Sequence, residues 1–143
     1  MWFFNNQEII SIPPCTGFVY CITNLTNNKK YIGKKLSHFT KTITKKVTLK
    51  SGIKKSKKVK VLVESDWQSY WGSCQRLLSD IESIGVDNFS REIIVFCYSK
   101  SELSYMEAKH QFDNNVLLSD DWYNGIISCR INKKHLTLLK VIK

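Results

Sequence analysis

Two tyrosines separated by a short turn are the residues of this chain best suited to act together in chemistry. Tyr20 ends the string Gly17-Phe18-Val19-Tyr20, and Tyr31 begins the string Tyr31-Ile32-Gly33. Tyrosine has a reference pKa near 10, so its hydroxyl is a poor base at neutral pH unless a metal ion or a cation assists. Two tyrosines on a hairpin are more often a cross-strand packing pair, and these two residues alone leave that alternative open.

The elements that must position these hydroxyls can be predicted from the surrounding pattern. Residues 17–23 and 29–34 form two strands, and the asparagine-rich stretch 24–28 between them tolerates the geometry of a turn. A third, buried strand is expected within residues 88–98, where Ile93 to Phe96 are all apolar.

Two helices are also expected. Helical spacing of apolar residues predicts a helix over residues 74–84, with Ser73 as its cap and Gly85 at its end. Ser99 followed by Glu102 forms a capping-box pattern that predicts a second helix over about residues 100–112.

The charge of the chain is concentrated in its first half. The net charge is +10, and thirteen lysines with no acidic residue lie between Glu8 and Glu64. The first 63 residues therefore carry +12 and the remaining 80 carry −2. A one-sided basic region of this kind favours a polyanionic partner, through long-range attraction and the release of counterions.

Residues 41–63 hold most of this charge in an alternating pattern. Apolar residues recur at odd positions before and after Ser51-Gly52, with threonines and lysines mostly between them. The pattern predicts a basic β-hairpin that turns near Ser51-Gly52, and a flexible basic loop is the alternative. The hairpin and its neighbourhood provide the candidate nucleic-acid-binding residues Lys34, Lys45, Lys46, Lys54, Lys55, Lys57 and Lys58.

These elements predict one α/β (α+β) domain over residues 1–143. We expect a small antiparallel sheet of three strands flanked by helices, with a lead-in at residues 1–16 and the basic insertion at 41–63. The five cysteines match no zinc site or disulfide framework, and no signal peptide or membrane-spanning run is evident. A cytoplasmic protein is expected.

Taken together, the two tyrosine strings, Glu107 on the second helix and Asn124 after Tyr123 resemble the GIY-YIG nuclease family, in particular its small phage-type endonucleases. The resemblance covers most of residues 17–126, although the first motif half carries one extra residue before Tyr20. It implies the sheet-and-helix fold predicted above and cleavage of DNA by phosphodiester hydrolysis. If the gene belongs to a phage, the protein is expected in the host cytoplasm.

The same resemblance assigns roles to individual residues. It implies that Glu107 holds Mg²⁺ (or Mn²⁺), that Tyr20 acts as a general base or positions the water, and that Tyr31 orients the water or the phosphate. Asn124 would brace the site through hydrogen bonds. A single carboxylate is sufficient for Mg²⁺, because this ion keeps several of its waters.

The chain departs from the family at one position. The family carries an arginine soon after the second motif half, but no arginine lies between Gly33 and Arg76 here. Lys35, Lys41 or Arg76 could supply the charge instead, although a lysine lacks the bidentate fork of an arginine. The chain is therefore expected to be a metal-dependent DNA endonuclease. The alternatives are a catalytically impaired nucleic-acid-binding protein on the same scaffold and an interaction protein that binds an acidic partner.

Overall fold

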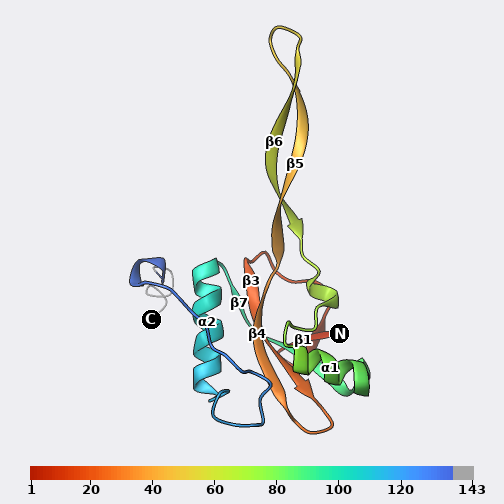
Figure 1. The fold of residues 1–143 in the computed structure, drawn as a ribbon, viewed down its shortest axis with the longest axis vertical. Helices are drawn as coiled ribbons and strands as arrows, with labels where there is room; N and C mark the ends of the chain where they lie inside the picture. Colours follow the sequence, from red (N-terminus) through yellow and green to blue (C-terminus); the bar gives the residue numbers. More distant parts are fainter. Residues whose placement is uncertain (137–143) are drawn as a thin grey trace.

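The computed structural model of the protein describes residues 1–136, which form a mixed α+β body with a long hairpin projecting from it (Figure 1). The body contains a five-stranded sheet in the order β2-β1-β7-β3-β4. The strands of the sheet are β1 (Trp2–Phe4), β2 (Gln7–Ile9), β3 (Gly17–Asn24), β4 (Lys30–Leu36) and β7 (Phe89–Cys97). The helices are α1 (Gln75–Ile84) and α2 (Lys100–Asp113), with short 3₁₀ turns at Trp67–Ser69, Val86–Asn88 and Lys133–Leu136.

The three predicted strands form the antiparallel part of the sheet. β3 pairs with β4 on one side and with β7 on the other, and the pairing with β7 shifts register between Val19 and Tyr20. Strand β4 is the edge of the sheet, so its outer side is open to other elements. Residues 121–124 run along part of this edge, and the candidate site lies beside them.

The sheet is larger than the predicted three strands, because residues expected as a lead-in form β1 and β2. β1 runs parallel to β7, with Trp2 beside Arg91, and a turn at Asn5 and Asn6 returns the chain into β2. Both asparagines have positive φ, 50° and 63°, as a tight hairpin turn requires. Strands of three residues are too short to show a periodic pattern, which is why the sequence did not reveal them.

The two faces of the sheet bury different residues. One face packs Phe18, Tyr20 and Ile22 of β3 against Trp2, Trp67 and helix α1. The other packs Val19, Ile32 and Cys97 against Leu103 of α2 and Val116. Because successive residues of a strand point to opposite faces, neighbours in β3 and β4 serve different sides of the molecule.

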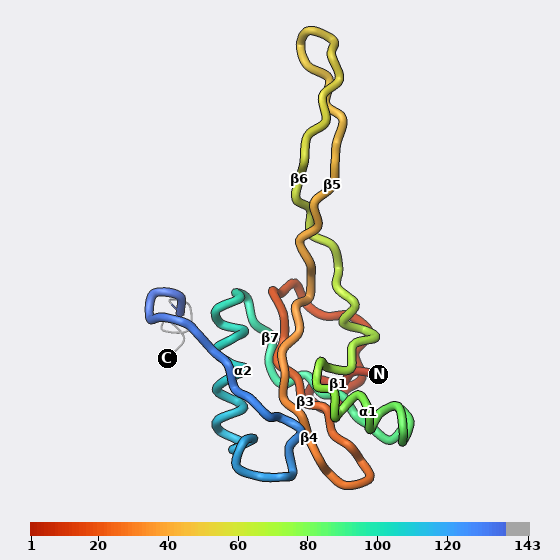
Figure 2. Tube along the Cα trace, in the orientation of Figure 1, coloured from red at the N-terminus to blue at the C-terminus, as the bar shows by residue number. Residues whose placement is uncertain are grey.

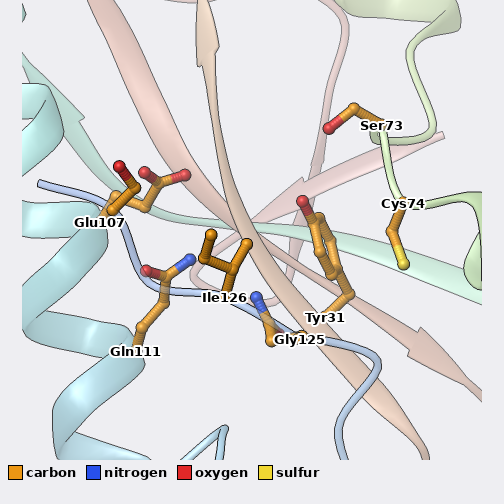
Figure 3. A pocket seen from close by; sticks show the side chains of 9 residues that line it. Tyr31, Ser73, Cys74, Glu107, Gln111, Gly125 and Ile126 are labelled. Carbon is orange, nitrogen blue, oxygen red and sulfur yellow. The ribbon is translucent and has the colours of Figure 1, made fainter.

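Both helices form where they were predicted, and their caps differ. Ser99 caps α2 by accepting a hydrogen bond from the Glu102 amide at 3.0 Å, which confirms that capping interaction. The prediction for α1 was wrong at its cap: Cys74, and not Ser73, precedes the helix, and no side chain caps it. Gly72, with φ of 90°, turns the chain just before Ser73, whose side chain then points toward Tyr31 (Figure 3).

The basic insertion is a hairpin of β5 (His38–Thr48) and β6 (Lys54–Glu64), longer than the predicted 41–63 and with Ser51-Gly52 in its turn as predicted. We call residues 38–64 the arm. Its eleven rungs run without a register shift from His38 opposite Glu64 to Thr48 opposite Lys54. The arm continues the direction of β4 beyond the body (Figure 2). Its base is tied by the Ser65 amide, which donates to the Ser37 carbonyl at 2.9 Å.

Candidate active site

The β3–β4 hairpin brings the two motif tyrosines together on one face of the sheet. Tyr20 pairs with Gly33 and Tyr31 pairs with Ile22, so the tyrosines are diagonal neighbours. Their ring centroids lie 6.2 Å apart. Gly33 is needed because the Tyr20 hydroxyl crosses directly over it, and a Cβ at this position would lie 2.5 Å from that oxygen.

The two tyrosines have different surroundings. Tyr20 is only 1% exposed and packs edge-on against Trp2, Phe18 and Tyr70. Burial, followed by its tyrosine neighbours, raises the pKa of Tyr20 well above its ordinary value. Tyr31 is only partly buried, and burial raises its pKa while a hydrogen bond with Ser73 opposes the rise. Tyr31 is therefore the tyrosine that a substrate can reach.

Glu107 approaches the same edge of the sheet from helix α2. It lies one helical turn from both Leu103 and Gln111, which are buried, so it belongs to the inner side of the helix. Its side chain is 15% exposed. Burial raises the pKa of the Glu107 carboxyl, and the ammonium group of Lys34, 3.8 Å away, acts in the opposite direction.

Tyr31 and Glu107 line one open pocket of about 300 Å³ at the edge of the sheet (Figure 3). Ser73 and Cys74 contribute to the Tyr31 side, and Gln111 lies on the Glu107 side. The segment from Asn124 to Ser128 supplies the rest of the lining. The pocket thus joins groups from both faces of the sheet around its edge strand.

Asn124 holds this segment against β4. Its side-chain oxygen accepts from the Ile32 amide at 3.0 Å, and its side-chain nitrogen donates to the Ile32 carbonyl at 2.8 Å. Gln111 donates to the same carbonyl at 3.1 Å. Sequence reasoning missed Gln111, although a polar residue one turn from Glu107 on the inner side of a helix was an available signal. These bonds fix the backbone next to Tyr31.

The consecutive lysines of β4 point to opposite faces. Lys34 donates to the Ser104 hydroxyl at 2.8 Å and stands beside Glu107, with 39% of its side chain exposed. Lys35 is 8% exposed, donates to Asp66 at 2.6 Å and lies 3.9 Å from the centre of the Tyr70 ring. The hydrogen bond from Lys35 lowers the pKa of Asp66, so the charge of Lys35 already has a partner.

The three candidates for the missing arginine, Lys35, Lys41 and Arg76, all lie outside the pocket. Lys41 belongs to the arm, opposite Val61. Arg76 is exposed on α1 and lines a separate hollow with Lys29, Asp80 and Tyr123. Among the predicted cations, Lys34 is the one that the structure places beside Glu107. The remaining predicted DNA-binding lysines, Lys45, Lys46, Lys54, Lys55, Lys57 and Lys58, are exposed on the arm.

A buried arginine supports the loop that carries Tyr70. The guanidinium of Arg91 lies 4.6 Å from the Trp2 ring centre and 4.1 Å from that of Trp71. It donates to the carbonyls of Gln68 and Tyr70 at 3.0 and 2.8 Å. Burial lowers the pKa of Arg91 to about 10. Arg91 therefore stabilises the aromatic side of the site without entering the pocket.

The donor set fits a hard cation held by one carboxylate. Within residues 1–136 no three histidine, cysteine or acidic side chains form a cluster that could hold a metal ion. Glu107 lines an open pocket with room for water, and Mg²⁺ commonly binds through one or two carboxylates and keeps several waters.

None of the helices within residues 1–136 has the length and apolar composition that a membrane-spanning helix needs.

The chain matches the family model described as "Putative endonuclease segE, GIY-YIG domain" over residues 2–127. This match spans most of the chain, so the protein belongs to the GIY-YIG endonuclease domain family. The resemblance predicted from the tyrosine strings is thereby confirmed, as is the mixed α+β fold class. Comparison with curated proteins gave no match, and comparison with solved structures gave none either.

Proposed function

We propose that the protein is a metal-dependent endonuclease of the small phage type that hydrolyses phosphodiester bonds in DNA. One observation carries the proposal: Tyr31 and Glu107 enter a single open pocket from opposite faces of the sheet, with Lys34 beside the carboxylate. A water held near Tyr31 and a phosphate held near Glu107 would then lie within the same small volume.

In this proposal Glu107 holds Mg²⁺ (or Mn²⁺), which when bound supplies positive charge for the phosphate and for the leaving oxygen. The Tyr31 hydroxyl orients the attacking water and accepts a hydrogen bond from it. As the water oxygen bonds to phosphorus, the bond from phosphorus to the leaving oxygen breaks, and the water's proton passes to solvent or to the leaving oxygen.

Tyr20 takes a supporting role in this mechanism. Its hydroxyl is buried, its pKa is raised and it does not line the pocket, so it is poorly suited to remove a proton from substrate water. Its ring supports Tyr31 from behind, and Asn124 holds the backbone of β4 in place. Lys34 contacts the phosphate as a single positive charge.

The experiment is a nicking assay on supercoiled plasmid DNA with Mg²⁺ or Mn²⁺, using Glu107→Ala as the control. Metal-dependent nicking by the parent protein that is lost in Glu107→Ala supports the proposal. DNA binding without nicking under all metal conditions would instead favour the impaired nucleic-acid-binding protein, which the lack of an arginine in the pocket makes the second candidate. Failure to bind DNA would point to an acidic protein partner.

A further inference from the structure

The arm is divided along its length into two chemically different halves. Its proximal rungs, from His38 opposite Glu64 to Ile43 opposite Val59, contain two lysines and six large apolar residues. Those apolar residues are Phe39, Ile43, Val59, Val61, Leu62 and Val63. The distal rungs and the turn contain seven lysines: Lys45, Lys46, Lys50, Lys54, Lys55, Lys57 and Lys58.

Positive charge surrounds the distal half on both faces of the ribbon. Residues directly opposite each other share a face, so Lys45 and Lys57 stand together on one side. Lys46 and Lys58 belong to the other side. No acidic side chain within residues 1–136 forms an ion pair with a lysine of the arm. Opposed like charges destabilise a hairpin, and a polyanion around the distal half would relieve that repulsion.

The proximal half has the character of a spacer. Ile43 faces Val59 and Phe39 faces Val63, and cross-strand pairs of β-branched and aromatic residues stabilise a ribbon. The ladder runs unbroken to the body, where the Lys35 ammonium lies over the Phe39 ring, 5.0 Å from its centre. The distal charge is therefore carried at a set distance from the body.

That distance can be estimated from the chain itself. Lys34, beside Glu107, precedes the distal rungs by ten to fourteen residues, and the arm continues the line of β4 (Figure 1). At about 3.3 Å per residue, the distal rungs lie roughly 33 to 46 Å from Lys34. One turn of B-DNA spans about 34 to 36 Å, and after one turn a duplex presents the same face again.

We propose that the distal half of the arm grips the phosphate backbone of duplex DNA about one helical turn to one side of the pocket, while the proximal half only spans the gap. This inference rests on the proposed function, since it takes the pocket as the place of cleavage. It predicts a one-sided requirement for flanking DNA that is independent of base sequence, because phosphate contacts position a duplex without reading it.

The test begins by mapping a cut made by the parent protein on a long duplex. Each flank is then shortened in turn from about 20 to about 4 base pairs, and kcat/KM is measured. We expect a loss of about tenfold or more as one flank falls below roughly 10 to 14 base pairs, and no comparable step on the other. Equal behaviour of the two flanks would overturn the inference.

Two matched double variants locate the contacts within the arm. Lys54→Gln with Lys58→Gln removes two charges from the distal half, and Lys41→Gln with Lys60→Gln removes two from the proximal half. The distal double variant should lose most of the dependence of kcat/KM on the length of that flank. The proximal double variant should show the same loss of kcat/KM at the same flank length as the parent. If both double variants lose the dependence of kcat/KM on flank length equally, only the total charge of the arm matters, and the inference of a distal grip is overturned.

A shortened arm tests the distance. Deleting Thr42 and Ile43 together with their partners Lys60 and Val59 removes two rungs and keeps every remaining residue on its face. The step should then move to a flank shorter by about 2 base pairs, because two residues span roughly 7 Å. An unmoved step would contradict a contact set by the length of the arm.

The failure of the proposed function is distinguishable from the failure of this inference. If the parent protein does not cut DNA, the proposed function fails, and the arm is judged by affinity for random duplexes of about 8 to 30 base pairs. The distal double variant should reach its highest affinity at a shorter duplex than the parent does. If affinity depends on duplex length in the same way in the parent and in the distal double variant, the distal half of the arm does not grip the DNA backbone.

Discussion

The lysines of β4 and those of the arm belong to one continuous run of chain but have opposite surroundings. Lys34 and Lys35 each have an acidic neighbour, at 3.8 and 2.6 Å, and Lys35 is buried. The distal lysines of the arm are exposed and have no acidic partner among the described residues. A lysine held by a neighbouring carboxylate is fixed at one point of the molecule, whereas exposed charges on a ribbon can follow a polyanion.

This comparison predicts that the two regions control different measured quantities. Changes around β4 and the pocket should act on kcat, because they remove groups that touch the reacting atoms. Changes in the arm should act on DNA affinity and on its salt dependence, because they remove phosphate contacts. The predictions below test that separation, from the largest expected effect to the smallest.

The largest effect is expected at Glu107. Glu107→Gln should reduce cleavage to background while DNA binding persists, because a neutral amide holds a divalent cation poorly. Binding is followed by gel shift and cleavage by plasmid nicking. Glu82→Gln, the same change at an exposed position of α1, is the matched control and should cut normally. Equal nicking by Glu107→Gln and the parent would remove Glu107 from the mechanism.

The tyrosine variants come next. Tyr31→Phe keeps the ring and removes the hydroxyl that borders the pocket, so kcat should fall roughly tenfold to a hundredfold. Tyr20→Phe should have a smaller effect, because the Tyr20 hydroxyl is buried behind it. Single-turnover cleavage measures both, with Tyr98→Phe, at a 58% exposed tyrosine, as the control. Normal cleavage by both motif variants would mean that the pair only packs.

The sequence predicted the parts of this site that depend on local pattern. The tyrosine hairpin follows from a polar turn between two apolar strings, and the Ser99 cap fixes where α2 begins and hence where Glu107 lies. The arm follows from alternation around Ser51-Gly52. Each of these signals is contained within a few consecutive residues.

What the sequence could not give depends on contacts between distant segments. The sequence does not show which of the two adjacent lysines, Lys34 or Lys35, lies beside Glu107, because this depends on where helix α2 packs against the sheet. The burial of Tyr20 depends on Trp2 and Tyr70, which are distant from it and from each other in the sequence. Gln111 belongs to the site because helix α2 packs beside β4, where the Gln111 side chain donates to the Ile32 carbonyl.

The arm should show its effect in salt dependence. Neutralising Lys54, Lys55, Lys57 and Lys58 together should weaken binding to all duplexes alike. If all four contact phosphates, the slope of log K against log salt should fall in magnitude by roughly three to four, at about 0.9 per contact. The melting temperature should not fall, since these side chains are exposed and the loss of the Lys57 charge relieves its repulsion with Lys45. An unchanged slope would show that the arm does not follow the DNA backbone.

The smallest effect concerns the pH dependence of cleavage. Burial raises the pKa of Glu107 and Lys34 lowers it, so Lys34→Met should raise that pKa further. Glu107 must be ionised to hold a cation, and a higher pKa means that the ionised form is lost at a higher pH as the solution is acidified. The acid limb of kcat/KM should therefore move to higher pH in Lys34→Met, with the difference from the parent greatest in mild acid and smallest in base.

Lys30→Met removes an exposed lysine from the same strand and the same face and is the matched control, while Lys34→Arg should restore the position of the limb. If Lys34→Met lowers cleavage by one factor at every pH, Lys34 acts on the phosphate alone, and the contrast between a lysine tuned by its partner and a lysine free to follow DNA no longer holds at this position.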